Sequence, residues 1–346
     1  MIVILLRRVF ILRKTKLLVL SILIIGMVLL SFTGCNKEGD LTKITVSEVT
    51  HSIFYSPQYA AISLGFFEEE GLKIELINGG GADKVMTAVL SGQVDIGFSG
   101  SESTVYVYNE GRDDYAITFA QLTQKDGSFL VGREPDPDFT FDKLIGKEVI
   151  GGRKGGMPEM TFEHVLRKHG IDPFKDLSID TSVQFDVMAG AFKGGQGDYV
   201  TLFEPVATAV EKEGIGYVVA SIGEESGIVA YTAYNAKKSF IEKNPEIIQK
   251  FTNAIYKGLQ WVEKSSYEEI AEAIKDFFPE MEMEDLIKVV KRYKDQESWP
   301  KDPIMTKESF EHMQDIIEAA GVLETRAPYE KLVNTKFAEK SVEEIK

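Results

Sequence analysis

The sequence contains one cysteine, Cys35, among 346 residues, and only four histidines. A single cysteine excludes an internal disulfide, so packing of side chains must hold the fold together. The HExxH motif is absent, and His164 and His169 lie five apart on one predicted helix, which is poor spacing for a metal ion. The G-x-x-x-x-G-K-[ST] and G-x-S-x-G motifs are also absent. The sequence therefore indicates neither a zinc site, nor a Walker-type phosphate loop, nor a serine hydrolase.

Positive charge is scarce as well. The chain has 39 Lys and Arg against 54 Asp and Glu, a formal net charge of −15. Nucleic-acid phosphates would be repelled by such a surface, which excludes a nucleic-acid partner. The acidic surplus serves solubility. The one long apolar run, from Leu17 to Leu30, is shorter than the ~20 residues of a membrane-spanning helix, and no second run reaches ~18.

That apolar run has the features of a secretory signal. A basic segment precedes it, comprising Arg7, Arg8, Arg13, Lys14 and Lys16. The string Phe32-Thr33-Gly34-Cys35 follows and resembles the lipobox of bacterial lipoproteins, with Phe32 where leucine is usual. The resemblance implies removal of a signal peptide at 1–34, a lipid on Cys35 and a polar tether at 35–42. Loss of the five basic residues would change the net charge to −20. The alternative is an ordinary free cysteine beside an uncleaved anchor.

From Lys43 the chain alternates between strand and helix patterns. Ile44 to Val49 alternates apolar and polar residues, and Pro57 to Phe67 has helical spacing after a proline suited to a first turn. Such alternation predicts parallel strands with helices on the sheet faces. We expect strands at 44–49, 72–77, 94–98, 115–122, 129–132, 148–151, 177–179, 199–202, 217–220 and 228–234. We expect helices at 57–67, 82–90, from 102, and at 158–168, 185–192, 205–212, 245–262, 267–277, 283–292 and 307–319.

Three strings resemble the nitrate/sulfonate/taurine and thiamine-pyrimidine-precursor (NMT1/THI5-like) family of ABC-transporter substrate-binding proteins. They are YAAISLGFFEEEGL at 59–72, AVLSGQVDIG at 88–97 after three glycines at 79–81, and GQGDY at 195–199 with FEP at 203–205. Their order and spacing make the resemblance specific, and it covers roughly residues 43–320. It implies an α/β, two-lobed periplasmic-binding-protein fold of type II, whose lobes carry mostly parallel sheets and close over a ligand by a hinge motion.

The resemblance also divides the chain. Lobe I would comprise 43–126 and 235–346, and lobe II would comprise 127–234, with the chain crossing between them near the strands at 120–132 and 228–234. The implied partners are a small-molecule ligand and the permease and ATPase subunits of an ABC importer. We expect a monomer outside the cytoplasm, anchored to the cell membrane through the lipid.

Ligands of open parallel sheets bind outside the carboxyl ends of the strands, so the residues after each predicted strand are the candidates. Lobe I offers hydroxyls, an imidazole, an amide and two rings, from His51, Ser52, Phe54, Tyr55, Ser99, Ser101 and Gln121. Backbone N–H groups at the helix start near Glu102 would suit an anion. Ser101 could equally serve only as the N-cap of that helix.

Lobe II offers a glycine turn beside basic residues, a ring and an acid, from Lys154, Gly155, Gly156, Met157, Phe185, Thr201 and Glu204. The glycines at 155–156 would allow close backbone approach to a ligand, or they form an ordinary solvated turn. Glu204 could pair with a cationic ligand, but capping of the helix that follows Pro205 is the better interpretation, because acids stabilise helix N-termini.

Two ligand chemistries remain open. A sulfonate, nitrate or taurine would suit the serines, the helix starts and Arg153 or Lys154. A pyrimidine precursor or another heteroaromatic molecule would suit stacking on Phe54, Tyr55 and Phe185. The candidate loops hold more rings and hydroxyls than cations, which favours the aromatic class.

We expect neither an enzymatic activity nor a bound cofactor. The family also includes pyrimidine-precursor synthases, which carry a cysteine-rich motif and a lysine that holds pyridoxal phosphate. This chain has no cysteine besides Cys35. A solute-binding protein is therefore the leading interpretation, and a lipid-anchored sensor of the same fold is the alternative.

Overall fold

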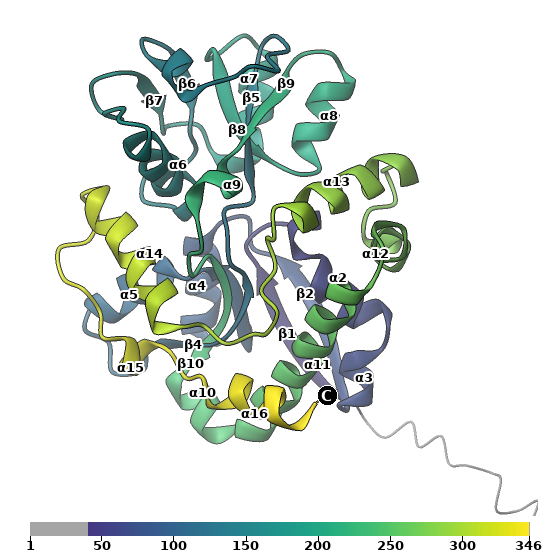
Figure 1. The fold of residues 1–346 in the computed structure, drawn as a ribbon. Helices are drawn as coiled ribbons and strands as arrows, with labels where there is room; N and C mark the ends of the chain where they lie inside the picture. Colours follow the sequence, from purple (N-terminus) through teal and green to yellow (C-terminus); the bar gives the residue numbers. More distant parts are fainter. Residues whose placement is uncertain (1–40, 346) are drawn as a thin grey trace, which may run out of the picture. The chain divides into compact units, whose positions relative to one another are not determined.

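The computed structural model describes residues 41–345, and Thr42–Lys346 forms one compact unit (Figure 1). The predicted signal peptide, Cys35 and most of the tether lie outside the described residues. Two five-stranded sheets organise the unit, and each has helices on its faces. We refer to the first sheet with its helices as lobe I and to the second as lobe II.

The sheet of lobe I has the strand order β2-β1-β3-β10-β4. β1 pairs in parallel with β2 and β3, whereas β10 runs antiparallel to both of its neighbours. Four of the five strands therefore share one direction. Alternation places Ile44 and Val46 in the core, as the strand pattern predicts. The strands are β1 (Thr42–Glu48), β2 (Leu72–Asn78), β3 (Ile96–Gly100), β4 (Ala116–Thr123) and β10 (Thr232–Lys237).

The sheet of lobe II has the order β7-β6-β8-β5-β9 and repeats this arrangement. β6 pairs in parallel with β7 and β8, and β5 runs antiparallel to β8 and β9. The prediction of an α/β fold with two mostly parallel sheets is confirmed. The strands are β5 (Ser128–Gly132), β6 (Glu148–Ile150), β7 (Ser178–Asp180), β8 (Tyr199–Phe203) and β9 (Tyr217–Ser221).

Helices connect the strands and form the tail. In lobe I they are the 3-10 turn η1 (Ile53–Tyr55), α2 (Ser56–Ser63), α3 (Phe66–Glu69), α4 (Ala82–Ser91) and α5 (Glu102–Asn109). In lobe II they are η2 (Phe141–Leu144), α6 (Met157–Lys168), η3 (Phe185–Val187), α7 (Met188–Lys193), α8 (Val206–Lys212) and α9 (Ile222–Ser226). The tail has α10 (Lys238–Lys243), α11 (Pro245–Lys264), α12 (Tyr267–Ile274), η4 (Lys275–Phe277), α13 (Met283–Asp295), α14 (Lys307–Ala319), α15 (Tyr329–Leu332) and α16 (Lys336–Glu344).

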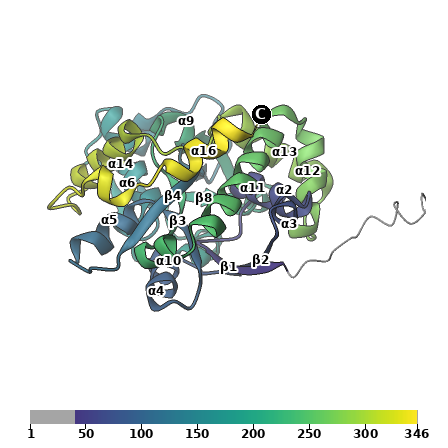
Figure 2. The ribbon, with the colours of Figure 1, turned by 90° about the horizontal axis from the view of Figure 1, so that it is seen from below.

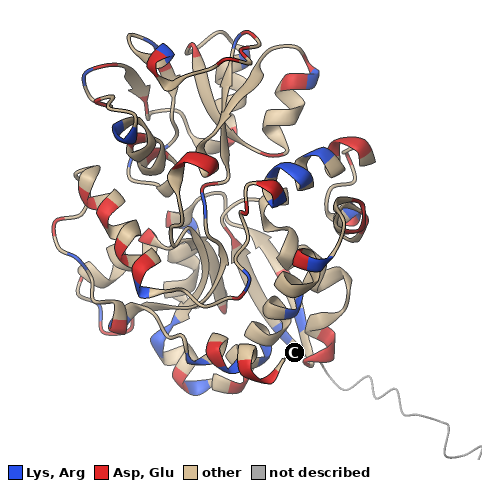
Figure 3. Cartoon of the chain, in the orientation of Figure 1, with Lys and Arg blue, Asp and Glu red and all other residues tan. Residues whose placement is uncertain are grey.

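Aromatic rings fill the core of lobe I. Phe98 of β3 stacks on Tyr234 of β10 at a centroid distance of 4.4 Å, and Phe251 of α11 meets Tyr234 edge-on at 5.0 Å. The tail thereby becomes part of lobe I rather than an appendage. In Figure 2, α16 lies beside α11, where Gln249 donates a hydrogen bond to the hydroxyl of Ser341 over 3.0 Å. Both acidic and basic residues occur along the outer helices (Figure 3).

The chain crosses between the lobes twice, at 124–127 and at 222–231. β10 begins at Thr232 and belongs to the sheet of lobe I, so the expected end of lobe II at 234 falls inside that strand. The expected strand at 228–234 is therefore wrong in its first half. Val229 instead donates its N–H to the carbonyl of Gln124 in the other crossing, which gives an extended segment without a sheet partner.

Asp126 stabilises the first crossing through hydrogen bonds of its carboxylate and its backbone carbonyl. Its carboxylate accepts hydrogen bonds from the N–H and the hydroxyl of Ser128, at 2.6 and 2.5 Å. Its backbone carbonyl accepts from the side-chain amide of Gln296 in the tail over 3.1 Å. A Cβ added at Gly223 would lie 2.1 Å from that carbonyl oxygen, so the second crossing approaches the first too closely for any side chain there. Burial raises the pKa of Asp126 to about 6.

Candidate functional site

A cavity of about 760 Å³ lies between the two lobes. Its walls follow the carboxyl ends of β1, β3, β6 and β8 and the starts of α4, α5 and α6. This is the edge at which open α/β sheets bind ligands. The sequence-based expectation that loops after these strands form a site rests on the same rule, and the cavity lies against these loops.

Glycines let the backbone of lobe II approach this cavity. Gly152, after β6, has a φ of 86°, in the left-handed region that favours glycine. A Cβ at Gly151 would lie 2.4 Å from a methyl group of Ile179. Both positions line the cavity, and the loop then turns into α6 at Gly156 and Met157.

The walls are mainly apolar. Four aromatic residues line the cavity, from both lobes and from the second crossing: Tyr55, Phe185, Phe203 and Tyr231. Met157 and Met188 complete the apolar lining. Tyr55 is fixed by an edge-on contact with Phe98 at 4.5 Å, and Phe185 tilts against Phe203 at 5.5 Å. Phe185 is 39% exposed, so its ring has room to adjust. Such walls suit a flat, apolar surface on the ligand.

Glu102 is a buried polar residue in these walls. It is the first residue of α5 and only 2% exposed, and among the described residues no group bonds to its Oε2. Burial raises the pKa of its carboxyl to about 7, although Arg153 and the N–H of Met157 act in the opposite direction. A buried acceptor without a partner costs free energy, and a ligand N–H can remove that cost.

Glu159 is a second carboxyl in the wall. Its Oε2 accepts a hydrogen bond from the N–H of Gly155 over 3.1 Å. Burial, followed by the neighbouring Glu163, raises the pKa of Glu159 to about 8. Glu163 itself pairs with Arg167 at 2.7 Å. Glu159 is therefore largely protonated at neutral pH, so it offers the cavity a neutral carboxyl rather than a second negative charge.

An outer chamber of about 830 Å³ adjoins the cavity. Both spaces are lined by Thr50, Phe185, Met188, Thr201 and Phe203. Further walls of the outer chamber come from His51, Ser52, Asn78, Asp186 and Glu204. The site therefore consists of an inner cavity with aromatic walls and an outer chamber with more polar walls.

Eight of the fourteen residues predicted to contact ligand line one of these spaces. Tyr55, Gly156, Met157, Phe185 and Thr201 line the cavity, and His51, Ser52 and Glu204 line the outer chamber. The ring nitrogens of His51 are already engaged, with Glu48 at 2.9 Å and with the carbonyl of Phe277 at 2.9 Å. The hydrogen bond to Glu48 raises the pKa of His51. His51 therefore stabilises lobe I and presents only part of its surface to the chamber.

The structure does not bring four other candidates from lobe I to the walls: Phe54, Ser99, Ser101 and Gln121. Phe54 is fully buried between Phe203 and Tyr293, and Ser99 bonds to Ser103 within lobe I. Ser99 and Gln121 belong to β3 and β4, where adjacent side chains face opposite sides of the sheet, and both are buried. Gln121 donates to the carbonyl of Thr123, and the N–H of Ser101 donates to the carbonyl of Tyr231.

Lys154 and Gly155 also lie outside both linings. Lys154 is exposed, at the tip of the turn before α6. Gly155 instead accepts a hydrogen bond across the lobes, from the hydroxyl of Tyr106 over 3.0 Å. The turn thus contributes a lobe–lobe contact at this position, and the neighbouring Arg153 lines the cavity.

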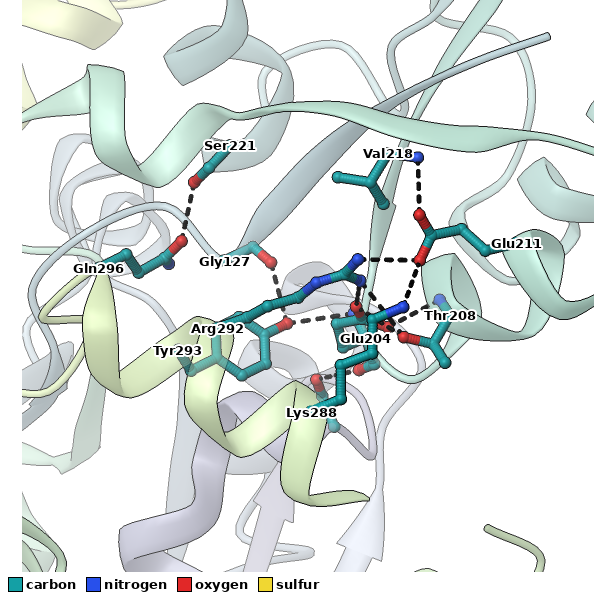
Figure 4. A network of polar contacts seen from close by, with 11 residues as sticks. Gly127, Glu204, Thr208, Glu211, Val218, Ser221, Lys288, Arg292, Tyr293 and Gln296 are labelled. Carbon is teal, nitrogen blue, oxygen red and sulfur yellow. Dashed lines mark hydrogen bonds and ion pairs between the residues drawn. The ribbon is translucent and has the colours of Figure 1, made fainter. Parts of the chain in front are cut away.

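Glu204 borders the outer chamber, but its carboxylate is engaged by protein groups. Its Oε2 accepts from the N–H of Thr208 at 2.8 Å, in the first turn of α8, and its Oε1 forms an ion pair with Arg292 of α13. The sequence-based interpretation of Glu204 as a helix cap agrees with this geometry. Figure 4 shows how Arg292 spans Glu204 and Glu211, with the second contact at 2.8 Å. Tyr293 donates to the carbonyl of Gly127 and accepts from the N–H of Glu204.

Sequence reasoning missed Glu102, Glu159 and Tyr231. Glu102 had a signal, because it directly follows the loop expected to bind ligand. Acidic residues are common in the first turn of a helix, however, so the position of Glu102 in the sequence does not reveal that its carboxyl is buried. Tyr231 lay within a segment expected to be a strand.

Two further properties concern residues 41–345. This part of the chain contains no group of three or more His, Cys, Asp or Glu side chains placed to hold a metal ion. No helix within it is long and apolar enough to cross a membrane.

Comparisons with known proteins agree with this architecture. A family model described as "NMT1/THI5 like" matches residues 54–267. A Bacillus subtilis (strain 168) protein described as "Putative binding protein YtlA" is 48% identical over 322 residues, covering 92% of this chain and 96% of that protein. A 4-amino-5-hydroxymethyl-2-methylpyrimidine phosphate synthase of Aspergillus parasiticus is 25% identical over 232 residues, covering 64% and 66%. The alkanesulfonate-binding protein SsuA from Xanthomonas axonopodis pv. citri, bound to MOPS, superposes with a TM-score of 0.68 at 15% identity, covering 85% and 98%.

Proposed function

Since the chain belongs to the NMT1/THI5-like family of binding proteins and synthases, we propose that it is an extracytoplasmic solute-binding lipoprotein of an ABC importer. In this proposal a small nitrogen heterocycle is captured between the lobes and passed to the permease. The chain itself catalyses no reaction. A lipid on Cys35 holds it at the membrane, where the permease lies.

The unpartnered Oε2 of Glu102 is the observation that supports this ligand class. A carboxyl oxygen enclosed by aromatic walls favours a ring that carries an amino or ring N–H group. Tyr55, Phe185, Phe203 and Tyr231 suit the faces of such a ring. A small anion fits less well, because Arg153 is exposed and Glu102 would have to become protonated beside the anion.

Thermal unfolding tests the ligand class. Residues 36–346 would be heated with aminopyrimidines, adenine, taurine, alkanesulfonates and nitrate. A ligand at 100 times its dissociation constant stabilises the folded state by about 2.7 kcal/mol. We expect the shift with a nitrogen heterocycle and none with nitrate. Glu102→Gln should weaken that shift, and Glu242→Gln, an exposed acid on α10, is the matched control. A shift with sulfonates alone would contradict the proposal.

Delivery to an importer needs a test in cells. Deletion of the gene should abolish uptake of the ligand that the unfolding assay identifies. Expression of the wild-type protein, which carries Cys35, should restore that uptake. Unchanged uptake with intact binding would instead support a lipid-anchored sensor.

A further inference from the structure

The outer chamber is more than an entrance to the inner cavity. The two spaces share five lining residues, and Phe185 stands at their boundary with its ring 39% exposed. The outer chamber is the roomier of the two spaces, and its shared walls make it continuous with the inner cavity. A single small ring would leave the outer space unused.

Hydrogen-bonding groups without charge surround the outer chamber. Thr50, Ser52 and Thr201 supply hydroxyls, and Asn78 supplies an amide at the mouth. The Oδ1 of Asn78 accepts from the N–H of Gly80 over 3.1 Å, which leaves its amide nitrogen as a donor. Ser52 donates to the carbonyl of Glu204 over 2.6 Å, and its oxygen accepts from the N–H of Phe54 over 3.3 Å. These are the partners that alcohol groups use.

The charges around the chamber disfavour an anion. The described residues that line it include no Lys or Arg, and Asp186 adds a carboxylate to the wall. Glu204 cannot serve a cation there, because Arg292 and Thr208 already occupy its carboxylate. A phosphate or sulfonate would thus meet no Lys or Arg, a His51 ring whose nitrogens are already engaged by Glu48 and Phe277, and the carboxylate of Asp186, whereas hydroxyl groups would find donors and acceptors.

We propose that the ligand is a nitrogen heterocycle with an uncharged, hydroxylated arm, of the nucleoside type. The ring lies in the inner cavity against Glu102, and the arm extends past Phe185 to Thr50 and Asn78. The inference rests on the proposed function, because it assumes that the ring binds in the inner cavity.

Matched ligand pairs test the arm. Calorimetry on residues 36–346, which contain the whole compact unit, would compare cytosine with cytidine and adenine with adenosine, and then each nucleoside with its 5′-monophosphate. We expect at least one nucleoside to bind tenfold or more tightly than its base, and the monophosphate to bind more weakly than the nucleoside.

Variants locate the arm. Asn78→Asp keeps the acceptor for Gly80 but removes the donor, and Thr50→Val removes a hydroxyl at nearly constant volume. Asn78→Asp should reduce the advantage of the nucleoside over the base about fivefold and leave affinity for the base unchanged, because Asn78 lines only the outer chamber. Thr50→Val, at a residue that borders both spaces, should reduce the same ratio. Glu102→Gln should weaken base and nucleoside by the same factor.

Two kinds of failure are distinguishable. The proposed arm is wrong if a base binds as tightly as its nucleoside, or if the monophosphate binds more tightly than the nucleoside. It is also wrong if neither arm variant changes the ratio of nucleoside affinity to base affinity. In each of these cases the proposed ring site in the inner cavity still stands. If no base or nucleoside binds and a sulfonate does, the proposed function fails and the arm with it.

Discussion

The hydroxyl of Tyr106, on α5 of lobe I, donates a hydrogen bond over 3.0 Å to the carbonyl oxygen of Gly155, in the turn that begins α6 of lobe II. On another side, Ser52 of lobe I donates to the carbonyl of Glu204 in lobe II over 2.6 Å. The lobes therefore touch through backbone carbonyls at two places beside the ligand cavity.

Tyr106→Phe should weaken ligand binding without unfolding either lobe. The lost hydrogen bond contributes about 0.5–1.5 kcal/mol, which corresponds to roughly a 2- to 13-fold loss of affinity if the contact exists only with the lobes together. Calorimetry with the ligand found by thermal unfolding measures the change. Tyr108→Phe, on the same helix, is the control. Equal affinities of wild type and Tyr106→Phe would show that the contact persists when the lobes separate.

Arg292→Met should destabilise the protein strongly. The carboxylate of Glu204 is completely buried and would lose its cationic partner, and breaking a buried pair in this way costs on the order of 3 kcal/mol. Lys288→Met is the matched control on the same helix. Its pair with Glu211 is about half exposed on the lysine side and contributes at most ~1 kcal/mol. Urea denaturation of both variants decides the matter, and similar midpoints would contradict the role given to Arg292.

Stability should fall as the pH rises from about 4 to about 8. Burial raises the folded-state pKa values of Asp126, Glu102 and Glu159 to about 6, 7 and 8. In that interval the unfolded chain loses these protons while the folded chain keeps them, so the unfolded state binds fewer protons and stability decreases with pH. For Asp126 alone, the shift from 3.8 corresponds to about 3 kcal/mol.

Urea unfolding of wild type and Asp126→Asn at pH 5 and pH 8 measures this effect. The variant should lose less stability between the two values than wild type does. His164, whose pKa burial lowers, contributes in the opposite direction near pH 6, so the comparison with the variant isolates Asp126. Parallel pH profiles would mean that Asp126 is ionised within the folded protein.

Gly258→Ala should destabilise the packing of α11 on α2. A Cβ there would lie 2.4 Å from the carbonyl oxygen of Pro57, so the two helices must separate, at a cost of about 1–3 kcal/mol. Gly190→Ala in α7 is the opposite case, since nothing lies within 4 Å of its added Cβ and helical glycine is unfavourable. Thermal unfolding should give a lower midpoint for the first variant and an equal or higher one for the second.

Cys35→Ser should leave an unprocessed precursor without lipid. The reason is that the lipobox resemblance places both cleavage and acylation at this cysteine. Labelling of cells with a fatty acid, followed by electrophoresis, measures the result. Label on the variant would contradict the lipoprotein hypothesis.

The strands were predictable because the residues that alternate as apolar in the sequence are the ones buried in the structure. Ile44 and Val46 show the period of two that a half-buried strand needs, and both are in the core. The crossing at 222–231 was not predictable in the same way. Val229 and Ala230 are as apolar as strand residues and fully buried, but the other crossing and the tail cover them instead of a neighbouring strand.

The loops of the site were predictable, and the side chains only in part. The rule that ligands bind beyond strand ends identified the turns at 50–56, 99–101 and 153–158. It could not tell which side chains in each turn point outward. Ser101 and Glu102 are neighbours, both buried, and only Glu102 borders the cavity. That difference depends on the rotation of α5 against α6 of the other lobe, which local sequence does not encode.

The position of β10 between β3 and β4 has a consequence for export. A chain that leaves the cell N-terminus first presents β3 and β4 long before β10, with the whole of lobe II in between. Lobe II is continuous in sequence, so it can complete its sheet before β10 emerges. At that stage β3 and β4 of lobe I still lack the strand that pairs with both of them. The order of emergence thus favours folding of lobe II first, and the exposed edges of β3 and β4 are where an extracytoplasmic chaperone would be needed.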